Sequence, residues 1–144
     1  ASDPDRLRSD DSLIGFIPLL LGHRLPADIA TRLIDRLSKG WITAWGPATE
    51  RPQSPLYEAD GYWRGPIWAP TTMLLWDGLI QQGGHDIAAE IARRFCRLCE
   101  TSGMAENFDA LTGEGLRDRA FAWTSAVYLT FAHWLGRTNQ GIPA

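Results

Sequence analysis

Hydrophobic residues recur along the chain with helical spacing in five stretches. The second and fourth stretches have one apolar and one charged face, whereas the first, third and fifth are apolar on nearly all sides. Very few segments alternate between apolar and polar residues, which argues against strands. The pattern therefore predicts an all-α protein with helices over residues 12–21, 27–38, 66–82, 86–101 and 119–135.

Residues near the ends of these stretches fit the expected helices. Ser12 is suited to cap the first helix, and Gly22 is suited to end it. Pro66 falls in the first turn of the third helix, where a missing N–H costs little. In the fourth helix, Glu90 and Arg94 are four residues apart, a spacing that favours an ion pair.

The helices alternate between buried and amphipathic, which is the order expected of a double-layered helical toroid. In such a fold each inner helix is covered by outer helices, so it has no broad polar face. Two long connections, over 39–65 and 102–118, both run from an outer helix to an inner one. They are therefore expected at the same end of the toroid, where they could build one site together.

The composition limits the classes of protein that fit this pattern. A chain of 144 residues with 44% hydrophobic residues can form a single helical domain with a sizeable core. A net charge of −3 and scattered arginines argue against nucleic acid, and no apolar run reaches the roughly 20 residues of a membrane helix. No secretory leader follows Ala1, so we expect a soluble, cytoplasmic protein with a trimmed or processed start. Residues 1–11 and 136–144 are expected to form flexible ends.

The cysteines and histidines do not predict a metal or cofactor site. Cys96 and Cys99 form one Cys-x-x-Cys pair, but a zinc site needs about four ligands and the sequence has no second pair. We expect both thiols to be reduced and packed within a helix. His23, His85 and His133 are isolated from one another, which is more typical of structural residues. Neither a metal nor a cofactor is expected.

The turn over 61–68 reads Gly-Tyr-Trp-Arg-Gly-Pro-Ile-Trp, with three aromatic residues and one arginine directly before a helix. Aromatic rings offer flat apolar faces and arginine offers a fork of donors, and together these suit a sugar. The alternative is that the aromatic side chains are buried core beside the start of a helix. The turn alone leaves both possibilities open.

Residues 103–115 of the second connection hold three carboxylates, at Glu106, Asp109 and Glu114. Glycoside hydrolysis usually needs two carboxyl groups, one to protonate the leaving oxygen and one to attack the sugar or activate a water. Burial among aromatic residues can tune a glutamate for proton transfer. The alternative is that these acids are solvated loop residues or turn formers, which fits Asp109 and Glu114 better than Glu106.

Three segments together resemble the C-terminal part of glycoside hydrolase family 63, which includes processing α-glucosidases and mannosylglycerate hydrolase, with trehalases as more distant relatives. The segments are the turn at 61–68, Glu-Asn-Phe-Asp-Ala-Leu-Thr-Gly-Glu-Gly at 106–115 and Phe-Ala-Trp-Thr-Ser-Ala at 121–126. The similarity keeps this order from residue 12 to residue 135. It implies part of an (α/α)6 toroid and an inverting α-glycosidase.

The resemblance also implies roles for individual residues. Glu106 corresponds to the general base that activates water, with Glu114 as the main rival carboxylate. Arg64 also matches a position of the family's aromatic turn, where it either contacts the sugar or stabilises the loop. Phe121 and Trp123 belong to the aromatic turn that begins the last inner helix, and the resemblance implies that they line the same sugar subsite. The residues implied to bind substrate are Tyr62, Trp63, Arg64, Gly65, Trp68, Phe121 and Trp123.

The general acid of the family is an aspartate far upstream, in a part of the toroid that this chain does not contain. Asp10 and Asp11 could be proposed in its place, but acids before a helix are ordinarily caps. Five helices are also fewer than the twelve of a closed toroid. If nothing covers them, the edges at 12–21 and 121–135 are expected to expose apolar surface.

Two functions from different classes remain. The first is the C-terminal portion of an inverting α-glycosidase, which carries the general base, binds an α-linked oligosaccharide or glycoside, and is inactive without its general acid. Association with the missing N-terminal part would then close the core. The second is a non-catalytic helical module that binds sugar or protein and self-associates. The particular sugar depends on loops outside this chain.

Overall fold

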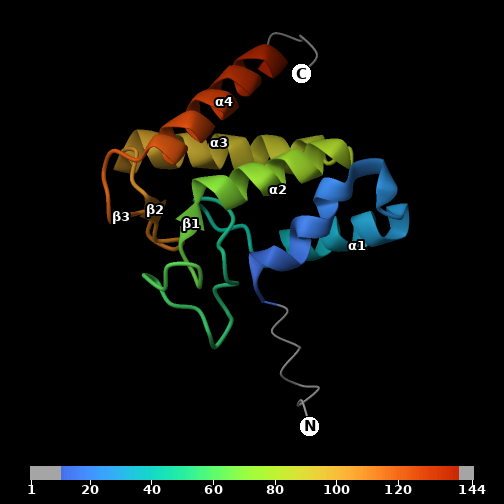
Figure 1. The fold of residues 1–144 in the computed structure, drawn as a ribbon, viewed down its shortest axis with the longest axis horizontal. Helices are drawn as coiled ribbons and strands as arrows, with labels where there is room; N and C mark the ends of the chain where they lie inside the picture. Colours follow the sequence, from blue (N-terminus) through green and yellow to red (C-terminus); the bar gives the residue numbers. More distant parts are fainter. Residues whose placement is uncertain (1–10, 140–144) are drawn as a thin grey trace.

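The computed structural model describes residues 11–139. Helices make up most of this part of the chain (Figure 1). Asp10 and most of the expected flexible ends lie outside the described residues. In chain order the helices are η2 (Leu13–Arg24), α1 (Ala27–Ser38), α2 (Ala69–Gln81), α3 (His85–Ser102) and α4 (Ala122–Asn139).

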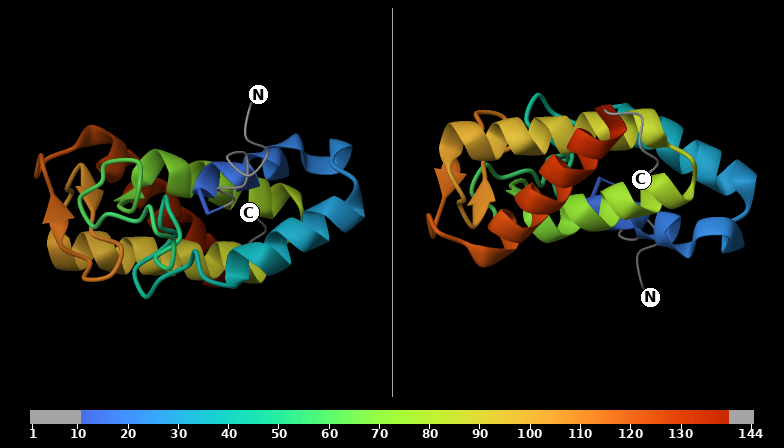
Figure 2. Two further views of the ribbon diagram at one scale, coloured as in Figure 1. Left: turned by 90° about the horizontal axis from the view of Figure 1, so that it is seen from below. Right: turned by 90° about the horizontal axis from the view of Figure 1, so that it is seen from above.

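The helices form two layers, as the alternation of buried and amphipathic patterns predicts. Figure 2 shows η2 and α2 in one row and α1 and α3 in the other, with α4 crossing α2 and α3. η2 packs against α1 and α2, whereas α3 packs against α2 and α4. The predicted all-α class is therefore confirmed, with η2, α2 and α4 as the inner helices and α1 and α3 as the outer ones.

η2 is a 3-10 helix, whereas the sequence predicted an ordinary helix over 12–21. Pro18 lies inside it and supplies no N–H. The Ser12 hydroxyl accepts a hydrogen bond from the Ile14 N–H at 3.4 Å, so the expected cap is present. The backbone bends at Gly22, where φ is 54°. Burial recurs every third residue, which is the period of a 3-10 helix, at Leu13, Phe16, Leu19 and Gly22.

A small antiparallel sheet, which the sequence did not predict, joins the two long connections. Its strands have two residues each, so they are too short to show an alternating pattern. The chain before α2 is extended as a strand, so α2 begins at Ala69 and its first-turn proline is Pro70 instead of Pro66. In spatial order the strands are β1 (Ile67–Trp68), β2 (Asn107–Phe108) and β3 (Gly115–Leu116).

The core holds the sheet on the helices. Ile67 of β1 and Phe108 of β2 are fully buried and share a cluster with Phe95 of α3 and Phe131 of α4. The Phe95 ring meets the rings of Phe108 and Phe131 edge to face, at 6.2 and 5.7 Å between centroids. Because this packing fixes β1 and β2, it also positions the two connections that they join.

The charged face of α3 anchors the first long connection. Arg94 pairs with Glu90 at 2.7 Å, which confirms the expected ion pair, and it also donates to the Thr43 carbonyl. Arg97 donates to the Ala44 carbonyl at 2.8 Å. The polar side of this outer helix is therefore a support for the loop as well as a solvated surface.

Each inner helix has an exposed apolar side, so the expectation that these helices are buried on nearly all sides is wrong for residues 11–139. The separate expectation of open apolar edges fits this result. Despite this apolar surface, none of the described helices has both the length and the hydropathy to cross a membrane. The exposed apolar residues of the inner helices are Ile14, Ile17, Leu21, Met73, Leu74, Trp123 and Leu129.

Cys96 and Cys99 are free thiols buried in α3, as expected. Burial raises the pKa of Cys96 to about 11 and the pKa of Cys99 to about 12, and the nearby Glu100 carboxylate adds to both shifts. Within the described part of the chain, no group of three or more His, Cys, Asp or Glu residues could hold a metal ion. The two cysteines are therefore best explained as core residues.

We expect both thiols to resist iodoacetamide at pH 8 in the folded protein and to react after unfolding, because only the thiolate is nucleophilic. Folding raises these pKa values, so the unfolded chain loses the thiol protons first. The free energy of unfolding should therefore fall as the pH rises from about 9 towards 12. Mass spectrometry with and without urea measures the alkylation. Rapid labelling of the folded protein would contradict the burial of Cys96 and Cys99.

Candidate active site

The two long connections meet at one end of the molecule, which confirms the prediction that they lie together. β1 directly follows the first connection and pairs with β2 in the second, with Trp68 opposite Asn107. The Tyr62 hydroxyl donates a hydrogen bond to Oε1 of Glu106 at 3.4 Å. Figure 1 shows the loops and the sheet at the same end of α2 and α3. We therefore take this end as the candidate active site.

Hydrogen bonds close the 61–68 turn on itself. The Glu58 N–H donates to the Arg64 carbonyl at 2.8 Å, across the neck of the turn. The Gly65 N–H donates to the Thr49 hydroxyl at 3.1 Å, so the turn is also tied to the earlier part of its own connection. The conformation of the turn is therefore held by polar contacts that do not involve its aromatic side chains.

The three aromatic side chains of the turn form one cluster. Trp63 stacks on Trp68 with 4.3 Å between ring centroids, and Tyr62 meets both rings at steep angles. Trp68 is buried and its Nε1 donates to the Tyr62 carbonyl at 2.8 Å. Tyr62 and Trp63 remain 42% and 46% exposed. The buried-core alternative thus describes Trp68, while the other two rings are available to a ligand.

Glu106 is half-buried directly before β2, and its N–H donates to the Asp118 carbonyl at 2.7 Å. The next residue, Asn107, is fully buried, and neither amide atom of its side chain has a hydrogen-bond partner among the described residues. An unpaired buried amide is costly, and Asn107 adjoins Glu106 in the chain, so we note it as a buried polar group next to the candidate base. Sequence analysis missed it because an asparagine in a loop has no distinctive pattern.

The other two acids of segment 103–115, Asp109 and Glu114, lie at the turn between β2 and β3. Oδ1 of Asp109 accepts from the N–H groups of Leu111 and Thr112 at 2.7 and 3.1 Å, which confirms the turn-forming alternative. Glu114 is exposed, and its carbonyl accepts from the Asp109 N–H at 2.9 Å. Because Asp109 follows Glu106 by three extended residues, this turn lies about 10 Å from Glu106. Glu114 is therefore at the far end of the hairpin.

The Tyr57 side chain, in the first connection, is partly buried and packs against the core cluster of Phe95, Phe108 and Phe131. Burial raises the pKa of Tyr57, and the Asp109 carboxylate adds to this effect. Its hydroxyl has no hydrogen-bond partner within residues 11–139. Tyr57 is consequently a neutral phenol throughout the physiological pH range.

Three further residues were assigned to the site from the sequence, namely Arg64, Phe121 and Trp123. The Arg64 side chain is exposed, and its backbone closes the turn. Phe121 and Trp123 meet edge to face at 5.3 Å at the start of α4. The Phe121 N–H donates to the Met104 carbonyl at 2.8 Å, so this pair is tied to the segment that leads to Glu106.

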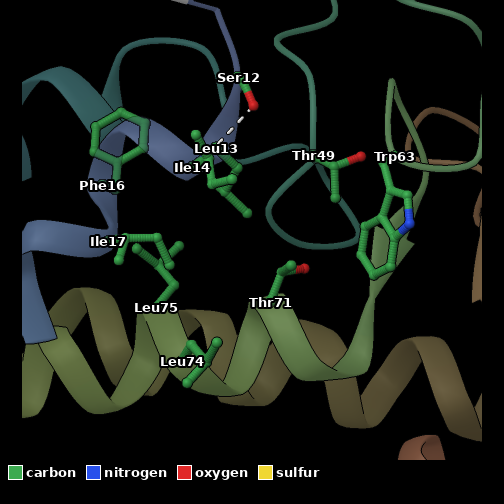
Figure 3. Close-up of a pocket in the computed structure, with 10 residues that line it drawn as sticks. All are labelled: Ser12, Leu13, Ile14, Phe16, Ile17, Thr49, Trp63, Thr71, Leu74 and Leu75. Carbon is green, nitrogen blue, oxygen red and sulfur yellow. Dashed lines mark hydrogen bonds between the residues drawn. The ribbon is translucent and has the colours of Figure 1, made fainter.

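Two apolar recesses flank α2. The first, of about 150 Å³, lies between η2 and α2, and Trp63 closes one end of it (Figure 3). The second, of about 310 Å³, lies between α2 and α4 and is lined by Met73 and Trp123. Glu106 lines neither recess. The Tyr62 hydroxyl contacts Glu106, while Trp63 lines the first recess and Trp123 lines the second.

Asp60 and Arg117 also join the two connections, although the sequence did not single them out. Their side chains form an ion pair, and the Arg117 guanidinium lies over the ring of Tyr62 at 5.0 Å from its centroid. They are 57 residues apart in the sequence, so no local pattern could have paired them.

Comparisons with known proteins identify the family of this chain. Residues 2–124 match the model of the mannosylglycerate hydrolase MGH1-like glycoside hydrolase domain. Mannosylglycerate hydrolase MGH1 from Selaginella moellendorffii is 31% identical over 126 residues, which make up 86% of this chain and 25% of that protein. The chain thus spans about a quarter of the length of this relative.

Solved structures indicate the same family. The GH63 mannosylglycerate hydrolase from Thermus thermophilus in complex with glucose matches with a TM-score of 0.74 at 28% identity, over 83% of this chain and 31% of that one. Neutral trehalase Nth1 from Saccharomyces cerevisiae shares the fold, with a TM-score of 0.66 at 20% identity over 92% of this chain and 26% of that one. The chain belongs to the mannosylglycerate hydrolase MGH1-like glycoside hydrolase domain family, which confirms the resemblance to glycoside hydrolase family 63.

Proposed function

We propose that this chain carries the general base and part of the sugar subsite of an inverting α-glycosidase. The contact between the Tyr62 hydroxyl and Glu106 supports this most directly, because a half-buried carboxylate lies beside exposed aromatic rings. Membership of a glycoside hydrolase family indicates the chemistry that such a pair would serve. In this proposal Glu106 is the base and Tyr62 holds it in place.

In an inverting reaction, water attacks the anomeric carbon while a base removes its proton and a separate acid protonates the leaving oxygen. Tyr62 donates to Oε1 of Glu106, which leaves Oε2 to accept from the attacking water. At 3.4 Å the Tyr62 hydrogen bond is long, and catalytic contacts of this kind shorten when substrate binds. Glu106 takes up the water proton as the bond between the anomeric carbon and the leaving oxygen breaks.

The exposed rings of Tyr62 and Trp63 are suited to the apolar face of the sugar. Trp63 stacks on the buried Trp68, so little side-chain freedom remains to be lost when sugar binds. This arrangement favours a preformed platform over one that assembles around the ligand. The remaining residues of the subsite are proposed to be Arg64, Gly65, Phe121 and Trp123.

The general acid is proposed to come from a part of the toroid outside this chain, so the isolated chain would be inactive. The exposed apolar residues of the inner helices support this, because helices of that part would cover them. The short span relative to MGH1 leaves ample length for those helices. Asp11 is a poor substitute for the acid because it pairs with Arg51 at 3.0 Å.

The proposed substrate is an α-linked glycoside, and mannosylglycerate is the first choice because the relatives are named for it. The test is to follow hydrolysis by the longer enzyme that carries this chain, using proton NMR. Inversion of an α-linkage should release sugar that is initially in the β configuration. Initial release of the α-anomer would overturn the inverting mechanism. Failure to hydrolyse α-linked mannosides and glucosides would overturn the proposed activity.

A non-catalytic helical module is the second candidate, which the exposed apolar residues of the inner helices favour. In that case the chain would self-associate or bind a protein through these residues, and bind sugar without turnover. Analytical ultracentrifugation of the 144-residue chain, combined with a sugar titration, tests this possibility. Turnover of an α-linked disaccharide by the purified chain would exclude it.

A further inference from the structure

We propose that Arg117 and Asp60 are positioning residues that hold the Tyr62 hydroxyl against Glu106. The inference rests on the proposed function, because its consequence for turnover requires Glu106 to be the base. Neither side chain is expected to touch the sugar. We call the two residues the Arg117–Asp60 clamp.

Backbone conformation gives the first support for the clamp. Tyr62 has φ of 57° and Arg117 has φ of 61°, and these are the two residues other than glycine with positive φ within 11–139. Non-glycine residues in this region are strained, and such strain persists only where surrounding contacts hold it. The two strained residues contact each other across the two connections. Their conformations are therefore linked.

The side chains supply that link. The Arg117 guanidinium lies over the Tyr62 ring at 5.0 Å from the centroid, and it is oriented by its ion pair with Asp60. Asp60 precedes Tyr62 by two residues in the same connection, so Arg117 contacts both the segment before the turn and the Tyr62 ring. The Arg117 side chain is 30% exposed, which strengthens a cation–π contact relative to a fully solvated one.

The register of the hairpin places the clamp beside the base. Asn107 of β2 lies opposite Leu116 of β3, so Glu106 and Arg117 are the next pair at the same end of the hairpin. The Glu106 N–H donates to the Asp118 carbonyl at 2.7 Å, which keeps the two backbones together beyond the strands. Arg117 therefore reaches Tyr62 from the backbone next to Glu106. This geometry sets the distance between the tyrosine hydroxyl and the carboxylate.

Loss of the clamp should lower turnover more than it weakens binding. We expect Arg117→Ala in the longer enzyme that carries this chain to reduce kcat by about 10- to 100-fold, because small displacements of catalytic groups have effects of this size. KM should change by less than about threefold, because Trp63 and Trp68 stay stacked without the arginine. Asp60→Asn should act in the same direction, since it leaves the guanidinium without its orienting charge.

Two further substitutions separate the clamp from a purely structural role. Arg117→Gly removes the side chain but relieves the positive φ, so the loop can keep its conformation without strain. We expect it to lower kcat as much as Arg117→Ala does. Arg117→Lys keeps a cation and should recover most of the lost turnover. Arg24→Ala, which removes an exposed arginine from the end of η2, is the matched control and should leave kcat unchanged.

Wild-type kcat in Arg117→Gly would overturn the clamp, because only the backbone conformation would then matter. A normal kcat in Arg117→Ala would overturn it as well. Crystal structures of the variants give a readout that does not depend on activity, since the Tyr62 hydroxyl should leave hydrogen-bonding distance of Glu106. If Glu106→Gln retains full turnover, the proposed function fails, and the clamp is then judged by the position of Tyr62 alone.

Discussion

Glu106→Gln should lower kcat of the longer enzyme by roughly 100- to 10,000-fold, the usual contribution of a general base. Glutamine has the shape of glutamate, and its amide oxygen can still accept from the Tyr62 hydroxyl. It cannot take up a proton from water at neutral pH. The substitution should therefore leave sugar affinity within about threefold of wild type, because the aromatic platform is unchanged. Steady-state kinetics with calorimetric titration of a sugar product measure both quantities.

Glu114→Gln is the matched control for this experiment. It makes the same chemical change in the same hairpin, but at the exposed turn instead of beside Tyr62. We expect its kcat to stay within about twofold of wild type, since surface substitutions away from a site have small effects. Near-normal turnover of Glu106→Gln together with a large loss in Glu114→Gln would transfer the role of base to Glu114.

Helical periodicity predicted the helices well because each of them buries a stripe of side chains against the other layer. α1 begins and ends at the expected residues, and α3 extends one residue beyond the expected range at each end. α4 begins three residues later than expected and continues to Asn139. The joint position of the two long connections also followed from this pattern, since it depends on the order of inner and outer helices alone.

Features that depend on single dihedral angles or on distant contacts could not be predicted in this way. No propensity indicates that Tyr62 and Arg117 adopt positive φ, because side chains other than glycine disfavour it. The two-residue strands β1 and β2 form because the core buries Ile67 and Phe108, and this burial is a tertiary effect. Sequence analysis therefore missed the sheet and the residues of the clamp.

Glu106 can be distinguished from the other loop acids only when its chemistry is combined with its position in the fold. By composition Glu106 and Asp109 are both acids in a loop, and the loop alternative was reasonable for each. Asp109 is a turn former, as its two backbone hydrogen bonds show. Glu106 differs because Tyr62, 44 residues earlier in the chain, contacts it. Only the resemblance to glycosidases marked Glu106 in the sequence, and only the fold explains the distinction physically.

Gly65→Ala should cost about 3 kcal/mol of unfolding free energy and displace the aromatic platform. A β-carbon at Gly65 would lie 2.0 Å from the Glu58 carbonyl oxygen and 2.9 Å from the Glu58 carbonyl carbon. Both are backbone atoms, so no side-chain rotation can make room. Gly65 also has φ of 156°, which other residues rarely adopt. The neck of the turn must therefore open, and the hydrogen bond from Glu58 to Arg64 must lengthen or break.

Two other glycines separate the causes of this loss. Gly83 has a positive φ of 75°, but no atom lies within 4 Å of an added β-carbon. Gly83→Ala should therefore cost only about 1 kcal/mol of unfolding free energy. Gly136→Ala lies inside α4 with open space around it and should stabilise the protein by about 0.5 to 1 kcal/mol. Urea unfolding measures all three. A Gly65→Ala protein no less stable than Gly83→Ala would mean that the turn can open freely, and the sugar platform would then not be rigid. The larger expected loss follows from close backbone approach at Gly65, the same feature that presents Tyr62 to Glu106.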